Sequence, residues 1–297
     1  MLNHIVARGK VVWGVTVLFD QVFLVRHHAA EVEVYDIATL TLQRHLVISG
    51  LLVSIDMTSS ANYNCLYVAD VGRHDGKTRF IHRVELNGTT TKWPLKDRPR
   101  GLSVTPDGSN VIVTCREIRK LKEYTTHGDL VREIRLQEDM TNPWHAVPLT
   151  SGQFVVSHGG SSDPLHRMCL VEVNGRLTKC FGGQPGSAAA QTCIPQHLVV
   201  DRDGSILVAD VNNDRVILLT ASLDYVRELV PRRDVIKRWR PVRLCLDAEH
   251  GVLYVAEAEW DGKAYIAGQL AAYHVKTFYK SDFSQILHET HRTVLAV

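Results

Sequence analysis

Two histidines occupy the same position of a recurring short element, and histidine is both a common metal ligand and a proton carrier near neutral pH. They are the third residues of Pro143-Trp144-His145 and Pro195-Gln196-His197. A zinc site needs three or four converging ligands, with an open position for water or substrate if it is catalytic. Two other repeats hold Gly101 and Arg243 at this position, and an arginine there opposes a cation. We therefore expect no metal and no other cofactor, and we expect His145 and His197 to bond loop backbone or to line a binding surface.

A second group of residues combines positive charge with aromatic rings. Arginines hold phosphates, while aromatic and guanidinium planes stack on unpaired bases. The formal net charge of the chain is only +2, so the distribution of charge matters more than its total. The residues that we predict to bind RNA or another partner are Arg98, Arg100, Arg116, Arg119, Lys120, Trp144, His145, His197, Arg238, Trp239, Arg240 and Arg243.

Motifs of other chemistries are missing from the sequence. It contains no GxxxxGK phosphate loop, no GxSxG and no HExxH. His158 ends a strand-like segment near the two histidines above, but no nucleophile can be nominated. We predict no catalytic residue and no enzyme.

Six short β-rich segments must position these side chains. They begin every 43 to 52 residues, each after an apolar segment and a turn, and each before two further strand candidates. The six are Val22–Arg26, Leu66–Asp70, Val111–Cys115, Phe154–His158, Ile206–Asp210 and Leu253–Glu257. Four short antiparallel strands in about 45 residues are typical of a propeller blade. We predict an all-β fold, a single six-bladed β-propeller with four antiparallel strands per blade.

The blade boundaries follow from this period. We place the blades at about residues 11–48, 50–95, 98–136, 142–182, 194–230 and 240–276. The sixth repeat lacks a clear fourth strand, so we predict that residues 3–10 supply it and close the ring. The tail at residues 277–297 is the alternative closing segment.

The fifth repeat contains Ala209-Asp210-Val211-Asn212-Asn213-Asp214-Arg215-Val216, which resembles the ADxxNxRV core of NHL repeats. Weaker echoes occur at His82-Arg83-Val84 and His166-Arg167-Met168, and Pro99-Arg100-Gly101 matches the opening P-x-G element. We interpret Asp70, Asp210 and Arg215 as turn-capping and pairing residues that indicate fold rather than a site.

The resemblance implies a domain like the C-terminal NHL propeller of TRIM-NHL type proteins. Several such propellers bind RNA on one face, and others bind proteins. It also leaves open a metal-dependent lyase, because the peptidyl-amidating lyases resemble NHL repeats. Our leading hypothesis is a non-enzymatic platform that binds single-stranded RNA as the recognition module of a larger regulator, with a protein partner on the same face as the alternative.

The charged residues in the loops predict that the two faces of the propeller carry charge of opposite sign. Loops between strands four and one, and between strands two and three, carry most of the arginines, including the run from 232 to 243. The other loops carry Asp20, Asp36, Asp56, Asp107, Asp129, Asp201, Asp203, Asp224, Asp247 and Glu249. We expect a basic binding face opposite an acidic one.

Compartment and assembly follow from composition. No apolar run approaches a membrane span or signal peptide, so we expect a cytoplasmic, monomeric propeller without membrane contact. The six cysteines show no CxxC spacing. We expect buried free thiols, with Cys169 and Cys180 as the one candidate pair if adjacent strands bring them together.

Overall fold

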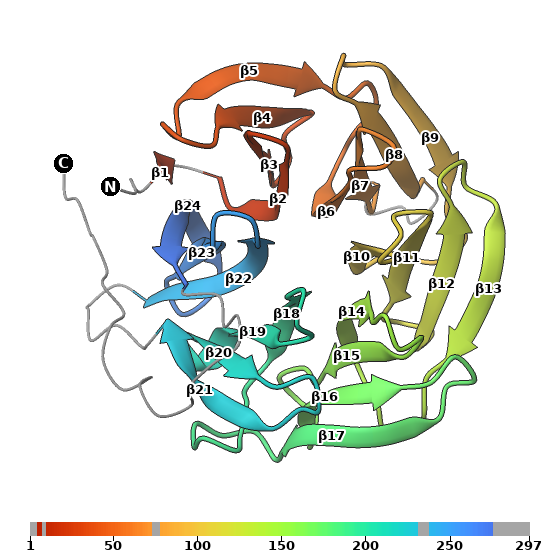
Figure 1. Cartoon of the computed structure of the whole chain (residues 1–297), viewed down its shortest axis with the longest axis vertical. Helices are drawn as coiled ribbons and strands as arrows, with labels where there is room; N and C mark the ends of the chain where they lie inside the picture. The colour runs from red at the N-terminus through yellow and green to blue at the C-terminus, as the bar shows by residue number, and fades with distance from the viewer. Residues whose placement is uncertain (1–4, 8–9, 73–77, 231–237, 276–297) are drawn as a thin grey trace.

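The computed structural model describes residues 5–7, 10–72, 78–230 and 238–275. These residues form six four-stranded antiparallel sheets arranged around a central axis, which is a six-bladed β-propeller (Figure 1). The prediction of an all-β propeller with four strands per blade is confirmed. No helix in the described ranges has the length and apolar character needed to cross a membrane.

The blades follow one another in chain order, with the first strand of each nearest the axis (Figure 1). Blade one contains β2 (Val12–Leu18), β3 (Gln21–Arg26), β4 (Glu31–Asp36) and β5 (Leu42–Val47). Blade two contains β6 (Ser54–Ser60), β7 (Cys65–Asp70), β8 (Phe80–Glu85) and β9 (Thr90–Pro94). Blade three contains β10 (Gly101–Val104), β11 (Asn110–Cys115), β12 (Lys120–Thr125) and β13 (Leu130–Arg135).

The second half of the ring repeats this order. Blade four contains β14 (Pro143–Pro148), β15 (Phe154–His158), β16 (His166–Val171) and β17 (Leu177–Gly183). Blade five contains β18 (Pro195–Val200), β19 (Ile206–Asp210), the short 3₁₀ helix η1 (Val211–Asn213), β20 (Arg215–Leu219) and β21 (Tyr225–Val230). Blade six contains β22 (Arg238–Asp247), β23 (Val252–Trp260), β24 (Tyr265–His274) and β1 (Ile5–Ala7).

The apolar second strands lie between neighbouring blades. Every residue of β7, β15 and β19 is buried, whereas most residues of the outer strands β5 and β13 are exposed. Six hydrophobic clusters each join two adjacent blades around the ring, the last joining blades six and one. Burial on both faces explains why these strands read as continuous apolar runs rather than as alternating ones.

The NHL-like motif in blade five forms hydrogen bonds with the loop that connects β17 to β18. Asp210 accepts hydrogen bonds from the backbone of Cys193 (2.6 Å), from Asn213 Nδ2 (2.7 Å) and from Arg215 Nε (2.8 Å). Arg215 also donates to Glu228 and to the Gln191 carbonyl. In blade two, Asp70 accepts from the backbone N–H groups of residues 52, 53 and 72. The interpretation of these residues as structural is confirmed.

The N-terminal strand closes the ring. β1 pairs antiparallel with β24, and the partners are Ile5 with Leu270, Val6 with Gln269 and Ala7 with Gly268. β1 therefore stands as the fourth strand of the last blade, beside blade one (Figure 1). This is the closing segment that the sequence predicted, and residues 276–297 lie outside the described ranges.

Four cysteines are free, as expected, and the one candidate pair forms a disulfide. Cys169 and Cys180 are directly paired across β16 and β17 and form a disulfide, with a Cα–Cα distance of 4.1 Å. Cys65, Cys115, Cys193 and Cys245 are free thiols. The conditional pairing named from sequence is realised because the register of the outer hairpin places the two residues opposite one another.

Candidate functional site

The first strand of each blade offers one equivalent position beside the axis. A β-bulge occurs in the first strand of five blades: β2, β6, β14, β18 and β22. The residue that resumes pairing after the bulge has an equivalent position in each of them. In blade three, Gly101 at the start of β10 has this position without a bulge. In chain order these residues are Gly14, Asp56, Gly101, His145, His197 and Arg243. We call this set the inner ring. Because bulges re-aim side chains at such positions, the inner ring faces residues of neighbouring blades.

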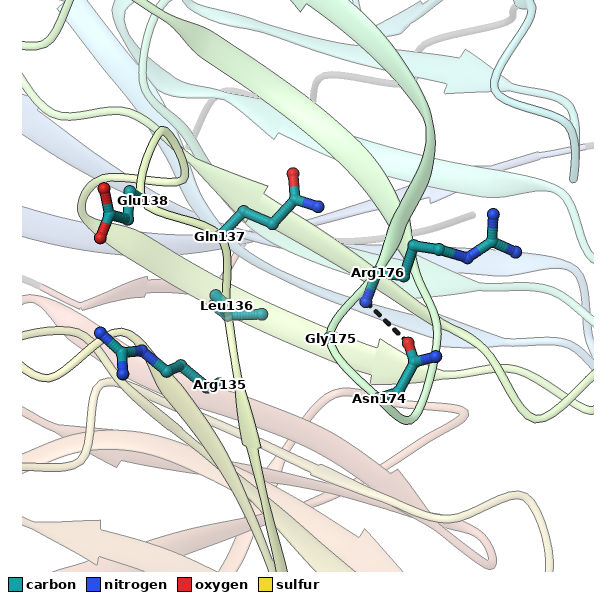
Figure 2. Close-up of a pocket in the computed structure, with 7 residues that line it drawn as sticks. All are labelled: Arg135, Leu136, Gln137, Glu138, Asn174, Gly175 and Arg176. Atoms are coloured by element: carbon teal, nitrogen blue, oxygen red, sulfur yellow. Dashed lines mark hydrogen bonds between the residues drawn. The ribbon is translucent and has the colours of Figure 1, made fainter.

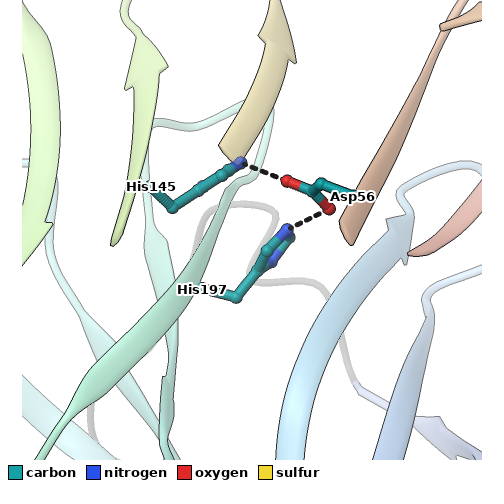
Figure 3. Close-up of side chains that lie close together, drawn as sticks. All are labelled: Asp56, His145 and His197. Carbon is teal, nitrogen blue, oxygen red and sulfur yellow. Dashed lines mark ion pairs between the residues drawn. The ribbon is translucent and has the colours of Figure 1, made fainter. Parts of the chain in front are cut away.

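Hydrogen bonds connect the inner ring from blade to blade. Asp56 Oδ2 accepts from the Leu102 backbone N–H (2.8 Å), and His145 Nε2 donates to the Leu102 carbonyl (2.8 Å). Figure 3 shows His145 and His197 approaching Asp56 from other blades, with Nε2 to carboxylate distances of 3.9 and 3.8 Å. The two imidazole rings stack at 4.0 Å.

Arg243 completes this circle of contacts. Its Nε donates to Asp56 Oδ1 (3.0 Å), and its Nη2 donates to the Ile55 carbonyl (2.5 Å). Arg243 belongs to blade six and Asp56 to blade two, so the bridge spans the position of Gly14 in blade one. A Cβ at Gly14 would lie 2.6 Å from the Met57 side chain. The inner ring therefore joins blades two to six by buried polar contacts.

Asp56, His145 and His197 have the composition of a metal site, but their hydrogen bonds do not fit one. His145 Nδ1 accepts from the Leu198 backbone N–H (3.4 Å), and His197 Nδ1 accepts from the Leu244 N–H (3.3 Å). These bonds place the ring protons on the two Nε2 atoms, which are the atoms near the carboxylate. A metal ligand needs a free lone pair there, and the Arg243 guanidinium already pairs with Asp56. The three residues fit a structural role instead.

The environment keeps both histidines neutral. Burial lowers the pKa of His145, although the nearby Asp56 carboxylate partly opposes this change. Burial and the neighbouring His145 and Arg243 lower the pKa of His197 well below its usual range. Neutral rings can each donate and accept one hydrogen bond, as the blade-to-blade contacts require.

A cluster of arginines surrounds Trp144 where blades three and four meet. The guanidinium carbons of Arg100 and Arg116 lie 4.2 and 4.3 Å from the centre of the Trp144 ring, within cation–π range. Trp144 Nε1 donates to the Gly159 carbonyl (2.7 Å), and Arg116 Nε donates to Asn142 Oδ1 (2.7 Å). We call Arg100, Arg116 and Trp144 the rim cluster. The Trp144 ring is half-buried, and two arginines contact it.

Blade six presents a second aromatic and cationic group. The rings of Trp13 and Trp260 flank Tyr265 at 5.7 and 5.0 Å in edge-to-face contacts. Arg240 lies 4.9 Å from the Trp260 ring and donates to Asn212 Oδ1 (2.9 Å). Burial raises the pKa of the Tyr265 hydroxyl, and the charges of Arg240, Arg100 and Arg243 partly oppose this rise. Tyr265 therefore lies within electrostatic reach of arginines from blades three and six.

Apart from Arg98, which lies within electrostatic reach of Arg100 and Arg116, the remaining predicted residues do not gather at the rim cluster. Arg98 is exposed and lies 3.6 Å from Glu117, while Arg119 donates to the Glu138 carbonyl (3.0 Å). Lys120 pairs with Glu133 on the outer strand β13 at 2.5 Å. Trp239 is half-buried in β22. The side chain of Arg238 and residues 231–237 of the basic run lie outside the described residues.

Two corrections concern the predicted faces. Asp56, assigned from sequence to the acidic loops, is buried in the inner ring. Some cations assigned to the basic loops are also paired, as in Arg98 with Glu117 (3.6 Å) and Lys120 with Glu133 (2.5 Å). Within the described ranges, arginines gather near Trp144 and Tyr265.

Trp13, Trp260 and Tyr265 were not predicted from the sequence as site residues, and Asp56 was predicted only in an acidic loop. The signal for Asp56 was its place in Ser54-Ile55-Asp56, which aligns with Pro143-Trp144-His145 but lacks the proline. Trp13 occupies the bulge of blade one as Trp144 does in blade four. The extra length of the β23–β24 hairpin was the signal for Trp260 and Tyr265.

An open groove also lies on the outer edge, between blades three and four. It is lined by Arg135, Leu136, Gln137, Glu138, Asn174, Gly175 and Arg176 (Figure 2). The Asn174 side chain accepts from the Arg176 backbone N–H and shapes the turn, and Arg176 pairs with Glu172. The side chains point away from one another in Figure 2 rather than converging, so we regard this groove as a blade junction.

Comparisons with known proteins support the fold and do not assign a family. No protein-family model matches the chain, and no curated protein matches its sequence. Similar solved structures include a protein of unknown function from Bacteroides thetaiotaomicron, with a TM-score of 0.68 and 13% identity over 90% of this chain and 70% of that chain.

Two enzymes are among the other similar structures. Virginiamycin B lyase from Staphylococcus aureus has a TM-score of 0.60 and 12% identity, over 93% of this chain and 88% of that chain. Hydrazine synthase from Kuenenia stuttgartiensis has a TM-score of 0.62 and 12% identity, over 92% of this chain and 98% of that chain. At this level of identity the likeness shows the propeller fold and carries no activity to this chain.

Proposed function

We propose that this propeller is a non-enzymatic binding platform that engages single-stranded RNA through the face on which the first strand of each blade begins. The observation that carries the proposal is the gathering of arginines and aromatic rings near the axis on that face. The rim cluster supplies Arg100, Arg116 and Trp144, and blade six supplies Arg240 beside Trp260. A guanidinium group stacked on an aromatic ring can present its N–H edge to phosphates and bases, although Arg116 and Arg240 each use one donor within the chain.

Aromatic side chains that can stack on unpaired bases favour single-stranded over double-stranded RNA. Single strands expose base planes, and proteins bind them with stacking groups beside cationic grooves. Three half-buried tryptophans here each contact an arginine: Trp144 contacts Arg100 and Arg116, Trp260 contacts Arg240, and Trp13 contacts Arg243. The resemblance of the fifth repeat to NHL repeats supports the same function, since several propellers of that kind bind RNA.

A lyase is the less well supported alternative. Such an activity needs a metal or a proton-transfer group that substrate can reach. His145, His197 and Asp56 are buried and already bonded to neighbouring blades, and the protons on Nε2 leave no lone pair facing the carboxylate. A protein partner on the same face remains the other binding hypothesis, because aromatic and arginine side chains also dominate protein interfaces.

The test is binding of a random single-stranded RNA pool at several salt concentrations, followed by sequencing of the retained RNA. We expect enrichment of a short motif and a fall in affinity with salt. In an Arg98→Gln/Arg100→Gln/Arg116→Gln variant, the slope of log binding constant against log salt concentration should become shallower by about 2. Each phosphate contact on a single strand contributes about 0.7 to that slope.

The matched control removes three exposed arginines elsewhere: Arg44→Gln/Arg176→Gln/Arg202→Gln. It changes the net charge equally and should keep the motif and most of the affinity. Equal weakening by both variants would mean that only overall charge attracts RNA. Salt-tolerant binding of a protein together with no enriched RNA would instead favour the scaffold.

A further inference from the structure

Arg100 lies within electrostatic reach of Arg243, Arg116 and Arg98, and its side chain has no hydrogen-bond or ion-pair partner among the described residues. It directly precedes β10, and its backbone N–H donates to the Thr114 carbonyl (2.8 Å), which fixes the start of the side chain. The following Gly101 is tightly confined, since a Cβ there would lie 2.7 Å from the Trp144 carbonyl oxygen. The Arg100 side chain then lies against the Trp144 ring.

The other arginines nearby already have acceptors. Arg243 pairs with Asp56 and the Ile55 carbonyl, Arg116 donates to Asn142, and Arg240 donates to Asn212. Among the described residues, no hydrogen bond or ion pair reaches the Arg100 guanidinium, and its Nε is buried without an acceptor. The residue as a whole is half-buried, and a partly buried charge without a bonded partner lowers the stability of the fold.

The electrostatic surroundings raise this cost. Burial and the like charges of Arg243, Arg116 and Arg98 lower the pKa of Arg100 well below the usual arginine range. Asp56 is the carboxylate that acts on Arg100 most directly, and it is already engaged by Arg243 and by the Leu102 backbone. Asp56 therefore balances the charge of Arg100 only in part, and no carboxylate of the described part of the chain bonds to the guanidinium directly.

We propose that Arg100, with Arg116 and Arg98 beside it, binds one phosphate group where blades three and four meet the axis. The planar guanidinium presents paired N–H groups that match two oxygens of a phosphate, and stacking on Trp144 fixes that plane. This proposal deepens the RNA-binding hypothesis and names Arg100 as the anchor of a backbone or terminal phosphate. Free phosphate shares this chemistry, so the experiment separates the two sources.

The first arm measures free inorganic phosphate binding by isothermal titration calorimetry, with thermal unfolding in parallel at constant ionic strength against chloride. For the wild-type chain we expect saturable binding and a rise in Tm of about 3 °C for each tenfold increase in phosphate above Kd. Arg100→Met should weaken phosphate binding at least tenfold and remove the rise in Tm. The same variant should melt at a higher temperature than wild type in phosphate-free buffer, because it removes an uncompensated charge.

Arg100→Lys and Arg202→Met are the comparison variants. Arg100→Lys keeps the charge without the planar fork, so it should bind phosphate more weakly than wild type yet better than Arg100→Met. Arg202 is exposed in the β18–β19 turn, and its replacement should leave the phosphate response unchanged. An unchanged phosphate response in Arg100→Met, or no response in wild type beyond that of chloride, overturns the proposal.

The second arm compares oligonucleotides of one sequence with 5′-phosphate and 5′-hydroxyl ends. A preference for the phosphorylated end that is lost in Arg100→Met assigns a terminal phosphate to the site. Equal binding of both ends with the same loss assigns an internal one. Phosphate binding without RNA binding would reject the RNA function and support a free-anion site, whereas RNA binding without phosphate binding would reject the site alone.

Discussion

The inner ring shows that one structural position of the repeat can hold residues with different roles. Glycine occupies it in blades one and three, where neighbouring atoms leave no room for a Cβ. Asp56, His145, His197 and Arg243 occupy it elsewhere, and each bonds a residue of another blade. The bonds of His145 and His197 need neutral imidazole rings, so the free energy of unfolding should depend on pH.

We expect the stability of the protein to fall as the pH drops below about 6.5, the usual histidine pKa. Burial lowers the pKa of His145 and His197 in the folded chain, and lowers that of His158 to about 4. The unfolded chain therefore binds more protons below pH 6.5, so acid favours unfolding. In His197→Gln the slope of unfolding free energy against pH should decrease by about 1.4 kcal/mol per pH unit between pH 4.5 and 6.

Urea unfolding at several pH values measures that slope. His250→Gln is the control, because His250 is exposed and its hydrogen bond to Asp247 raises its pKa. Loss of His250 should therefore not reduce the acid sensitivity. An unchanged slope in His197→Gln would show that His197 is already protonated in the folded chain.

At the scale of elements, the turn between the third and fourth strands of a blade contacts the blade before it. Gly128 in the β12–β13 turn has φ +97°, and a Cβ there would lie 2.4 Å from Trp93 of blade two. Gly175 in the β16–β17 turn has φ +84°, and its Cβ would lie 2.1 Å from the Arg135 carbonyl oxygen. Both turns therefore pack closely against the preceding blade, and Figure 2 shows Gly175 of the second turn near Arg135 and Leu136.

We predict that Gly128→Ala destabilises the fold by about 2–5 kcal/mol, measured by chemical denaturation. Backbone strain at positive φ contributes about 1–2 kcal/mol, and displacement of Trp93 contributes a further 1–3 kcal/mol or so. Gly88→Ala separates the two contributions, because Gly88 has φ +92° in the matching turn of blade two and nothing within 4 Å of a Cβ. Equal losses in both variants would show that the Trp93 contact adds nothing.

Strand periodicity predicted the blades well, because burial between neighbours leaves a continuous apolar run in every second strand. The site was harder to predict. The register gives Arg100 and Trp144 equivalent places in adjacent blades, but only the folded ring shows that their side chains meet. Asp56 was assigned to the wrong face because Ser54-Ile55-Asp56 lacks the proline that marks the other inner strands. Counting charges in each class of loop also could not show which arginines pair with acidic residues of other loops.

At the scale of the whole molecule, the ring depends on a short strand from the opposite end of the chain. β1 contributes three paired residues to β24, beside Gly268, whose Cβ would lie 2.8 Å from Val11. Without β1, the last blade has three strands and β24 becomes an unpaired edge. Edge strands with free N–H and C=O groups open locally and associate with other chains.

We predict that deletion of residues 1–9 opens this junction while the other blades stay folded. Hydrogen exchange should quicken at Gly268–Leu270, whose partners in β1 are lost, and the central strands β7, β11 and β15 should keep their protection. The Tm should fall, and the shortened chain should self-associate at higher concentration through β24. Deletion of residues 277–297 is the comparison, since that tail was the alternative closing segment in the sequence. If the tail deletion alone deprotects β24, the closing strand comes from the C-terminus; if the N-terminal deletion does so, propeller closure by β1 is established in solution.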